Sequence, residues 1–259
     1  MDSGPVHTFI IDLPCWDEGV RISNTHFEAN VARLGGALGV SQFRALNSYF
    51  RVTRSTFDSN TAFEKGGAIH ISGVQSAALF QNGCVFRSNS AVRDANGGAI
   101  SVENNAALRI FNATAIDNEA SGTGNGGFLS AHFGGHIVLH HVKVSGAQSG
   151  PEGGGGAISA LATKMTLNQV LINNCSAGSR GGGGILLDGA SSLDLVSGCT
   201  LSKNVATLES YGGHIRMASS KLRVHSMSTA TNYIVEASGP AFPETETLNP
   251  SSTSAFLGT

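Results

Sequence analysis

Charged residues are scarce in this chain of 259 residues, at 13% of the sequence and about half the usual share. The formal net charge is only −2, which argues against nucleic acid or an anionic membrane surface as a partner. The four cysteines, Cys15, Cys84, Cys175 and Cys199, are too few and too scattered for a disulfide framework, and no pair has metal-ligand spacing. Cysteine usage therefore leaves the compartment open.

No stretch of the sequence has the pattern of a signal peptide or a transmembrane helix. No basic residue precedes Arg21, and the apolar run at residues 9–11 ends at Asp12. We therefore expect no membrane span within the chain. The localisation is open between the cytosol and, if the chain is a piece of a longer secreted protein, the cell surface or extracellular space.

Glycine, by contrast, is abundant, and much of it occurs in a repeated phrase, Gly-Gly-Ala-Ile, with looser copies. Glycine accounts for 34 residues, roughly double the usual share. The aliphatic position of the phrase recurs in steps of 27 to 31 residues, at Leu38, Ile69, Ile100, Leu129, Ile158, Ile185 and Ile215. Self-similarity at a period of about thirty residues predicts a repeat array.

A second phrase, Phe-x-x-Asn, keeps pace with the first and weakens along the chain. Its apolar position is occupied by Phe27, Phe57, Phe86, Ala115, Val144, Leu171 and Leu201. The asparagines at 30, 60, 89, 118, 174 and 204 are expected to form a ladder of stacked amides, interrupted at Ala147. Two phrases in step mark one corner of a repeating coil.

Each repeat reads as three short strands, and helical spacing is poor throughout. In residues 68–72, for example, Ile69 and Ile71 point one way while His70 and Ser72 point the other. The sequence therefore predicts an all-β fold, a single-stranded right-handed parallel β-helix of about seven coils. A leucine-rich solenoid would need a regular leucine framework, and a propeller would need a longer period.

The period also divides the chain. Residues 1–26 are expected to form an N-terminal cap and lead-in, because the first coil would otherwise expose apolar side chains and strand edges. Residues 27–237 form the β-helix repeats. Residues 238–259 hold three of the six prolines and many serines and threonines, which is typical of a flexible tail.

The pairing of Phe-x-x-Asn with Gly-Gly-Ala-Ile, as in Phe86-Asn89 with Gly97–Ile100, resembles the repeat of the chlamydial polymorphic outer-membrane proteins, which are autotransported surface adhesins. More broadly it resembles the pectin-lyase-like right-handed β-helix superfamily. The resemblance covers about residues 27–232. It implies the β-helix fold and either an adhesin-like role or one of the superfamily's activities on acidic polysaccharides.

The outward positions of the strand after each Gly-Gly pair are predicted to form a flat face of small and polar residues. The candidate binding face comprises His70, Ser101, Ser130, Ser159, Asp188 and Arg216. Glu103 and His132 fall in one column on adjacent coils and are the candidate catalytic pair. Cleavage or epimerisation of an acidic polysaccharide should need three or more convergent ionisable groups, so polar groups on a solvated sheet are the competing interpretation.

His136 and His140 are weak metal candidates, because they crowd one coil together with His132 and His141. Steps of four residues bring histidines together on a helix but not on a strand. We therefore expect no metal and no cofactor.

Two functional hypotheses follow. The leading one is a non-enzymatic β-helix module, acting as a stalk or as an adhesin-like surface for a glycan or protein partner. The alternative is a polysaccharide lyase, hydrolase or epimerase acting at the same outer face. The sequence defines neither the substrate nor the oligomeric state.

Overall fold

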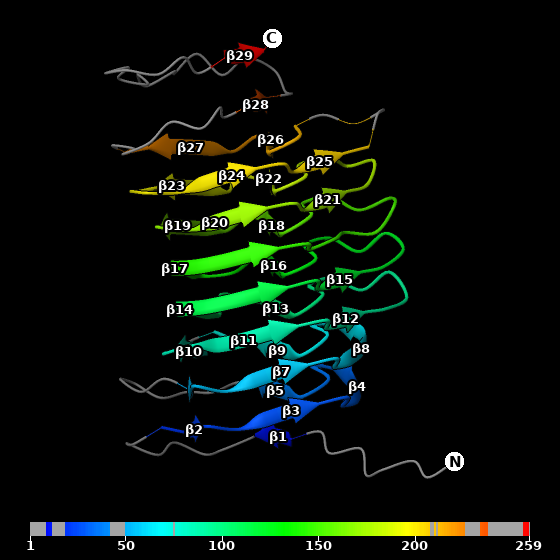
Figure 1. Cartoon of the computed structure of the whole chain (residues 1–259), viewed down its shortest axis with the longest axis vertical. Coiled ribbons are helices and arrows are strands. Elements are labelled where there is room, and N and C mark those ends of the chain that lie inside the picture. The colour runs from blue at the N-terminus through cyan, green and yellow to red at the C-terminus, as the bar shows by residue number, and fades with distance from the viewer. Residues whose placement is uncertain are drawn as a thin grey trace.

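Neighbouring strands pair in parallel throughout the computed structural model, which describes residues 9–11, 19–41, 50–74, 76–207, 210, 212–225, 234–237 and 256–258. These residues contain strands and no helix. The chain winds as a right-handed β-helix into a rod of stacked coils, with β1 (Phe9–Ile11) at one end and β29 (Phe256–Gly258) at the other (Figure 1). The predicted fold class is confirmed.

The strands that follow the Gly-Gly pairs form one sheet of ten strands, called here the Gly-Gly sheet. Between β1 and β29 its order is β5 (Leu38–Ser41), β9 (Ile69–Ser72), β13 (Ile100–Glu103), β16 (Leu129–His132), β18 (Ile158–Leu161), β22 (Ile185–Asp188), β26 (Ile215–Met217) and β28 (Ile234–Ala237). Seven successive coils, from β5 to β26, thus contribute one strand each.

A second sheet of thirteen strands, called here the long sheet, takes up the next part of every coil. Its main row is β2 (Arg21–Ser23), β6 (Phe50–Thr53), β10 (Ala77–Gln81), β14 (Ala107–Ile116), β17 (His136–Ser145), β19 (Lys164–Asn168), β23 (Ser192–Leu195) and β27 (Lys221–Val224). Beside this row lie β3 (His26–Glu28), β7 (Thr56–Asp58), β11 (Cys84–Arg87), β20 (Leu171–Asn173) and β24 (Thr200–Ser202).

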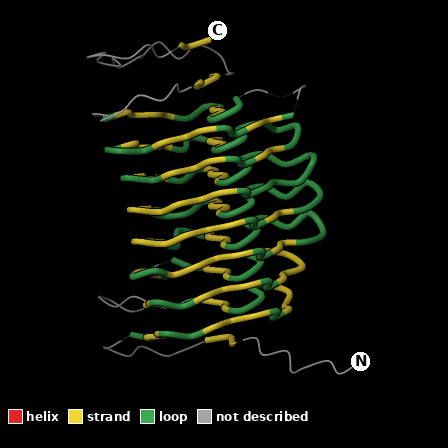
Figure 2. The backbone as a smooth tube through the Cα atoms, in the orientation of Figure 1, coloured by secondary structure: helices red, strands yellow, loops and turns green. Residues whose placement is uncertain are grey.

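The third part of each coil is a very short strand just before the next Gly-Gly pair. These strands form two small sheets, called here the corner sheets. One contains β4 (Val31–Leu34), β8 (Thr61–Lys65), β12 (Ser90–Ala91) and β15 (Glu119–Ala120), and the other contains β21 (Ser176–Ala177) and β25 (Val205–Ala206). Gln148 bridges the two sheets, because it pairs with both Glu119 and Ser176. Figure 2 shows the three parts repeating along the rod.

Most of the predicted lead-in and tail lies outside the described residues. Within the lead-in, β1 pairs with β5 of the Gly-Gly sheet, and β2 pairs with β6 of the long sheet. Within the tail, only β29 is described.

The core is built from side chains stacked on their counterparts in the next coil. The predicted aliphatic column is confirmed: Leu38, Ile69, Ile100, Leu129, Ile158, Ile185 and Ile215 are in register and at most 1% exposed. Beside it, the rings of Phe27, Phe57 and Phe86 stack with centroids 4.9 and 5.2 Å apart. Stacked aromatic pairs of this kind add stability beyond the area they bury.

Phe128 lies in the core and not on the outer side of the Gly-Gly sheet. Strict alternation with Leu129 would place it outward, beside Ala37, Ala68, Ala99 and Ala157, but all five side chains are fully buried. The ring centroid of Phe128 lies 5.7 Å from that of Phe86, where the stacked phenylalanine column ends and Ala115 begins. The large side chain therefore fills volume that the small one leaves, as close packing of the core requires.

The register of one coil also differs from the prediction. Ile172, not Leu171, pairs with Val144 and Leu201, so Cys175 takes the ladder position and Asn174 is exposed at a positive φ of 53°. Because Leu171 and Ile172 are both apolar, the pattern of apolar residues does not reveal this one-residue shift. The shift nevertheless reverses which of the two side chains faces the core.

The asparagine ladder is confirmed in the first coils. The side-chain oxygen of Asn89 accepts hydrogen bonds from the backbone and side-chain amides of Asn60, at 3.0 and 2.9 Å. The side-chain nitrogen of Asn89 donates to Asn118 and to the carbonyl of Phe57, both at 2.9 Å. Asn204 makes a separate rung with Cys175 and Ile172.

The two glycines of each pair have different tasks. Gly97 has a positive φ of 73°, a conformation that side chains with a Cβ adopt only under strain. Gly98 has an ordinary φ but lies directly against the backbone of the next coil, at Gly127 and Glu119. The Gly-Gly phrase therefore combines a sharp turn with a close approach of two coils.

Candidate functional site

The predicted binding face is largely covered, so its expected exposure is wrong. His70, Ser101, Ser130 and Ser159 are 7%, 1%, 2% and 4% exposed. The chain just before several of the Gly-Gly pairs lies over the outer side of the Gly-Gly sheet, whereas the outward position of Gly39 in the first coil is open.

Two contacts show this covering. Lys65 precedes Gly66 and reaches Glu103, while a Cβ on Gly154 would lie 2.7 Å from the side chain of Leu186. The covering segments are tied to one another, because the side chain of Asn125 donates to that of Asn96 at 3.0 Å.

Glu103 and His132 are brought together as predicted, on paired positions of β13 and β16. No hydrogen bond joins the two side chains in the described part of the chain. The carboxylate of Glu103 is 12% exposed and instead accepts a hydrogen bond from the ammonium group of Lys65, with Nζ and Oε2 2.7 Å apart. His132 is half-buried, and burial lowers its pKa, although the Glu103 carboxylate opposes the shift.

His70 extends this group, which we call the Glu103 cluster: Lys65, His70, Glu103 and His132. His70 lies on β9, next to β13. Burial lowers its pKa; the Glu103 carboxylate opposes this shift and the Lys65 ammonium group adds to it. Its buried Nδ1 has no hydrogen-bond partner in the described residues. Sequence reasoning missed Lys65, because it lies 38 residues from Glu103 and only the path of the chain before Gly66 brings the two together.

Asp188 and Arg216 belong to a second polar group further along the rod. Arg180 links them: its guanidinium donates to Asp188 at 3.2 Å, and its backbone carbonyl accepts a hydrogen bond from Arg216. Arg180 also contacts the side-chain oxygen of Asn125 at 3.4 Å. Asp188 and Arg216 are both half-buried and are both bonded to Arg180, which precedes the Gly182-Gly183 pair.

The two metal candidates do not converge. His136 and His140 are four residues apart on β17, which separates them by about 13 Å along a strand. His136 contacts the hydroxyl of Thr166 at 3.1 Å, and His140 lies edge-on to Phe111 with ring centroids 5.8 Å apart. Among the described residues, no group of three or more His, Cys, Asp or Glu side chains is placed to hold a metal ion.

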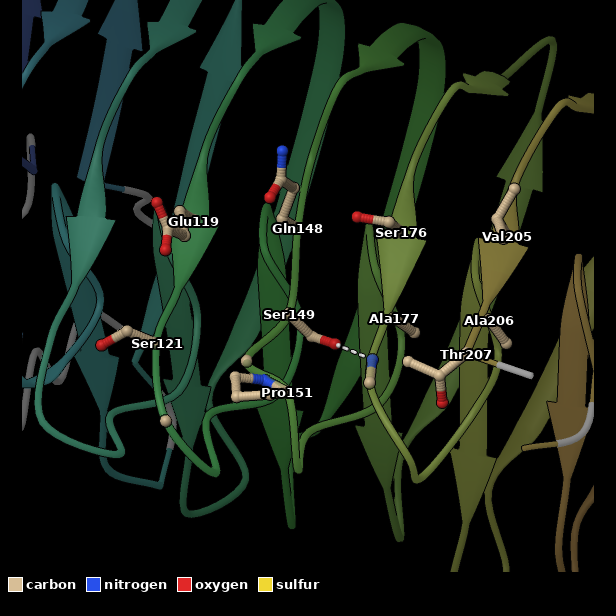
Figure 3. Close-up of a pocket in the computed structure, with 13 residues that line it drawn as sticks. Glu119, Ser121, Gln148, Ser149, Pro151, Ser176, Ala177, Val205, Ala206 and Thr207 are labelled. Carbon is tan, nitrogen blue, oxygen red and sulfur yellow. Dashed lines mark hydrogen bonds between the residues drawn. The ribbon is translucent and has the colours of Figure 1, made fainter. Parts of the chain in front are cut away.

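A groove of about 390 Å³ follows the corner sheets along the rod. Figure 3 shows its residues in two rows that cross four coils. The first row contains Glu119, Gln148, Ser176 and Val205, and the second contains Ser121, Ser149, Pro151, Ala177, Ala206 and Thr207. Gly122, Gly150 and Gly178 also line the groove. The side-chain oxygen of Ser149 accepts a hydrogen bond from the backbone of Gly178 at 3.3 Å, which joins neighbouring coils in the second row.

Sequence reasoning missed the groove, although one signal for it was present. The segment between the aligned alanine of the corner strand and the Gly-Gly pair lengthens along the chain, from two residues between Ala32 and Gly35 to five between Ala120 and Gly126. The longer connections bulge outward beyond β12, β15 and β21 in Figure 1. A wall beside the corner strands requires this extra length.

No helix long and apolar enough to span a membrane occurs in the part of the chain that the structure describes. Comparison with protein-family models, curated proteins and solved structures finds no match for this chain. The functional argument therefore depends on the geometry of the Glu103 cluster and the groove.

We expect the free energy of unfolding to fall as the pH is lowered from 7.5 to 5.5, because His70 is buried and His132 is half-buried. Burial holds the pKa of His70 and His132 below the ordinary 6.5 in the folded protein. Below pH 6.5 the unfolded chain therefore binds more protons than the folded protein. The stabilisation is fully present above pH 6.5 and is lost as the pH falls from 6.5 to the pKa of each folded histidine. The free energy of unfolding decreases by up to about 1.4 kcal/mol per pH unit for each histidine.

Urea unfolding at the two pH values measures this slope. His70→Gln should flatten it, whereas the same change at the exposed His225 should leave it as in the wild type. Equal stability of the wild type at both pH values would contradict the prediction.

Proposed function

We propose that this chain is a non-enzymatic β-helix module that binds an extended glycan in the groove along its corner sheets. The observation that carries the proposal is the row of Glu119, Gln148, Ser176 and Val205, which presents one side chain per coil along the groove. Parallel pairing repeats these positions at steps of about 4.8 Å. A straight, periodic groove suits a linear polymer better than a compact small molecule.

The chemistry of the groove supports a hydroxyl-rich ligand. Five of its described lining residues carry a hydroxyl or amide side chain and one carries a carboxylate, between the apolar side chains of Pro151, Ala177, Val205 and Ala206. The amide of Gln148 is exposed and the hydroxyl of Ser176 is half-buried, and neither makes a hydrogen bond within the described residues. Such groups suit broad contact along a chain, whereas transition-state stabilisation needs donors fixed around one reacting atom.

The resemblance of the repeat to surface-adhesin repeats supports a stalk-like presentation of the groove. Each coil is fixed to its neighbours by stacked side chains and by backbone pairing in the Gly-Gly sheet, the long sheet and the corner sheets. A rod of this kind is rigid along its length, so it keeps the groove straight without a bound partner. Binding would then require little ordering of the protein, which lowers its entropic cost.

Filling the groove tests the proposal. Ser176→Trp should block its centre and lower the affinity for a bound oligosaccharide by at least about tenfold, equivalent to about 1.4 kcal/mol. Isothermal titration against a panel of neutral, cationic and anionic oligosaccharides measures the change.

Ser202→Trp is the matched control, because Ser202 is also half-buried on a strand but lies on the long sheet, away from the groove. This variant should bind as the wild type does. Unchanged affinity of Ser176→Trp, or equal losses in both variants, would contradict binding in the groove.

A second candidate function is acid–base chemistry on an acidic polysaccharide at the Glu103 cluster. The contact of Lys65 with Glu103, beside His132, gives this cluster the three ionisable groups that such chemistry requires. We rank it second because the Glu103 carboxylate and the Lys65 ammonium group neutralise each other, and because the carboxylate is only 12% exposed to a substrate.

We expect no turnover of pectate or alginate by the wild type, with or without Ca²⁺. Unsaturated sugar ends absorb in the near ultraviolet, so their release is followed directly. Release that is lost in both Lys65→Met and Glu103→Gln, but kept in the groove variant Ser176→Trp, would establish a lyase at the Glu103 cluster instead.

A further inference from the structure

The charge found in the groove is negative. Of the described residues that line it, only Glu119 carries an ionisable side chain. Glu119 is exposed on β15 and makes no ion pair with any residue that the structure describes. No lysine, arginine or histidine is among the lining residues that the structure describes. A carboxylate without a counter-ion in a binding groove is a recognition element for a cationic group.

The groove is also graded along its length. In register from one coil to the next, it presents the carboxylate of Glu119, the amide of Gln148, the hydroxyl of Ser176 and the aliphatic Val205, which is 60% exposed. Three steps of about 4.8 Å make this row about 14 Å long. A ligand that matches it is an extended chain with a cationic group near Glu119, hydrogen-bonding groups in the middle and an apolar face near Val205.

Charge disfavours the usual acidic polymers as ligands. A polyuronate, a sulfated glycan or a nucleic acid would bring negative groups toward Glu119 without a cation to receive them, and like charges at contact distance repel by about 1 kcal/mol even in water. A sugar chain with free amines has the opposite charge, and its rings carry hydroxyl groups on their edges and C–H groups on their faces.

We propose that the groove selects an oligosaccharide of amino sugars with free amines, and that the ammonium group of one ring binds the carboxylate of Glu119. The hydroxyl groups of the following rings then bind Gln148 and Ser176, and a ring face covers Val205. This inference rests on the proposed function, because it names the class of glycan that the same groove takes.

The probes are a glucosamine hexamer, its fully N-acetylated counterpart and an oligogalacturonate, titrated into the whole chain. The glucosamine hexamer should bind most tightly, and raising the ionic strength to about 0.5 M should remove most of its preference. Glu119→Gln should weaken binding of the glucosamine hexamer by about two- to fivefold, the range for an exposed ion pair, and leave the acetylated hexamer unaffected.

Glu28→Gln is the matched control, because Glu28 is also an exposed glutamate on a strand, on β3, outside the groove. It should leave binding of every probe unchanged. Equal affinity for both hexamers with no effect of Glu119→Gln would overturn the amino-sugar inference and leave a glycan groove in place. Equal losses in the two glutamate variants would overturn it as non-specific attraction. Binding of no saccharide in the panel would overturn the proposed function as well.

Discussion

Gly98→Ala should destabilise the folded chain by about 3 kcal/mol or more, although it adds one methyl group. A Cβ at this position would overlap the carbonyl oxygen of Gly127 and lie 2.5 and 2.6 Å from backbone atoms of Glu119. All three atoms belong to the backbone of the next coil, so no side chain can rotate away. Relief requires that two coils move apart, which breaks their parallel hydrogen bonds, and overpacking of this kind is costly.

Gly39→Ala is the control for this prediction, since the same methyl group at Gly39 meets no atom within 4 Å. This variant should remain within about 0.5 kcal/mol of the wild type. Urea unfolding followed by circular dichroism measures both. A Gly98→Ala protein as stable as Gly39→Ala would show that the coils approach one another less closely than the structure has them.

Asn89→Leu is expected to cost more than about 3 kcal/mol, because it removes the middle rung of the ladder. The substitution leaves both amide donors of Asn60 without the oxygen that accepts them. It also leaves the carbonyl of Phe57 without its donor. Asn89 is fully buried, so water does not replace these partners, and each unsatisfied group costs about 1–3 kcal/mol.

Asn173→Leu provides the comparison, because Asn173 is half-buried on β20 and its side chain makes no hydrogen bond among the described residues. Its stability in urea should match that of the wild type. If Asn89→Leu unfolded at the same denaturant concentration as Asn173→Leu, the ladder would contribute no net stability.

The sequence was sufficient to predict the fold because the same corner is repeated in every coil. A parallel stack places Ile69, Ile100 and Ile158 in one column, so one local pattern, seen several times, defines the period, the strand direction and the core. The errors occurred where a single coil departs from its neighbours. Leu171 and Ile172 are chemically alike, and only pairing with β17 and β24 decides which of them faces the core.

The candidate site could be predicted only in part, because it depends on segments that do not repeat. Register alone placed Glu103 beside His132. The covering of Ser101 and the contact from Lys65 depend on how the chain enters each Gly-Gly turn, which the strand pattern does not encode. The groove depends on the length of the connections that follow the corner strands. These connections form a wall of the groove only when several coils are stacked.

The modular corner has a consequence for how such a groove changes size over evolutionary time. In-phase duplication of one unit, such as residues 100–128, would insert a complete coil whose Gly-Gly turn and inward column match both neighbours. The rod would lengthen by about 4.8 Å. The packing of each coil against its two neighbours, on which the stability of a repeat protein depends, would be preserved. A coil copied from the groove region would bring its own lining residue, as Gln148 does between Glu119 and Ser176. The length of ligand that the groove accommodates can thus change in steps of one coil, without any change to the core.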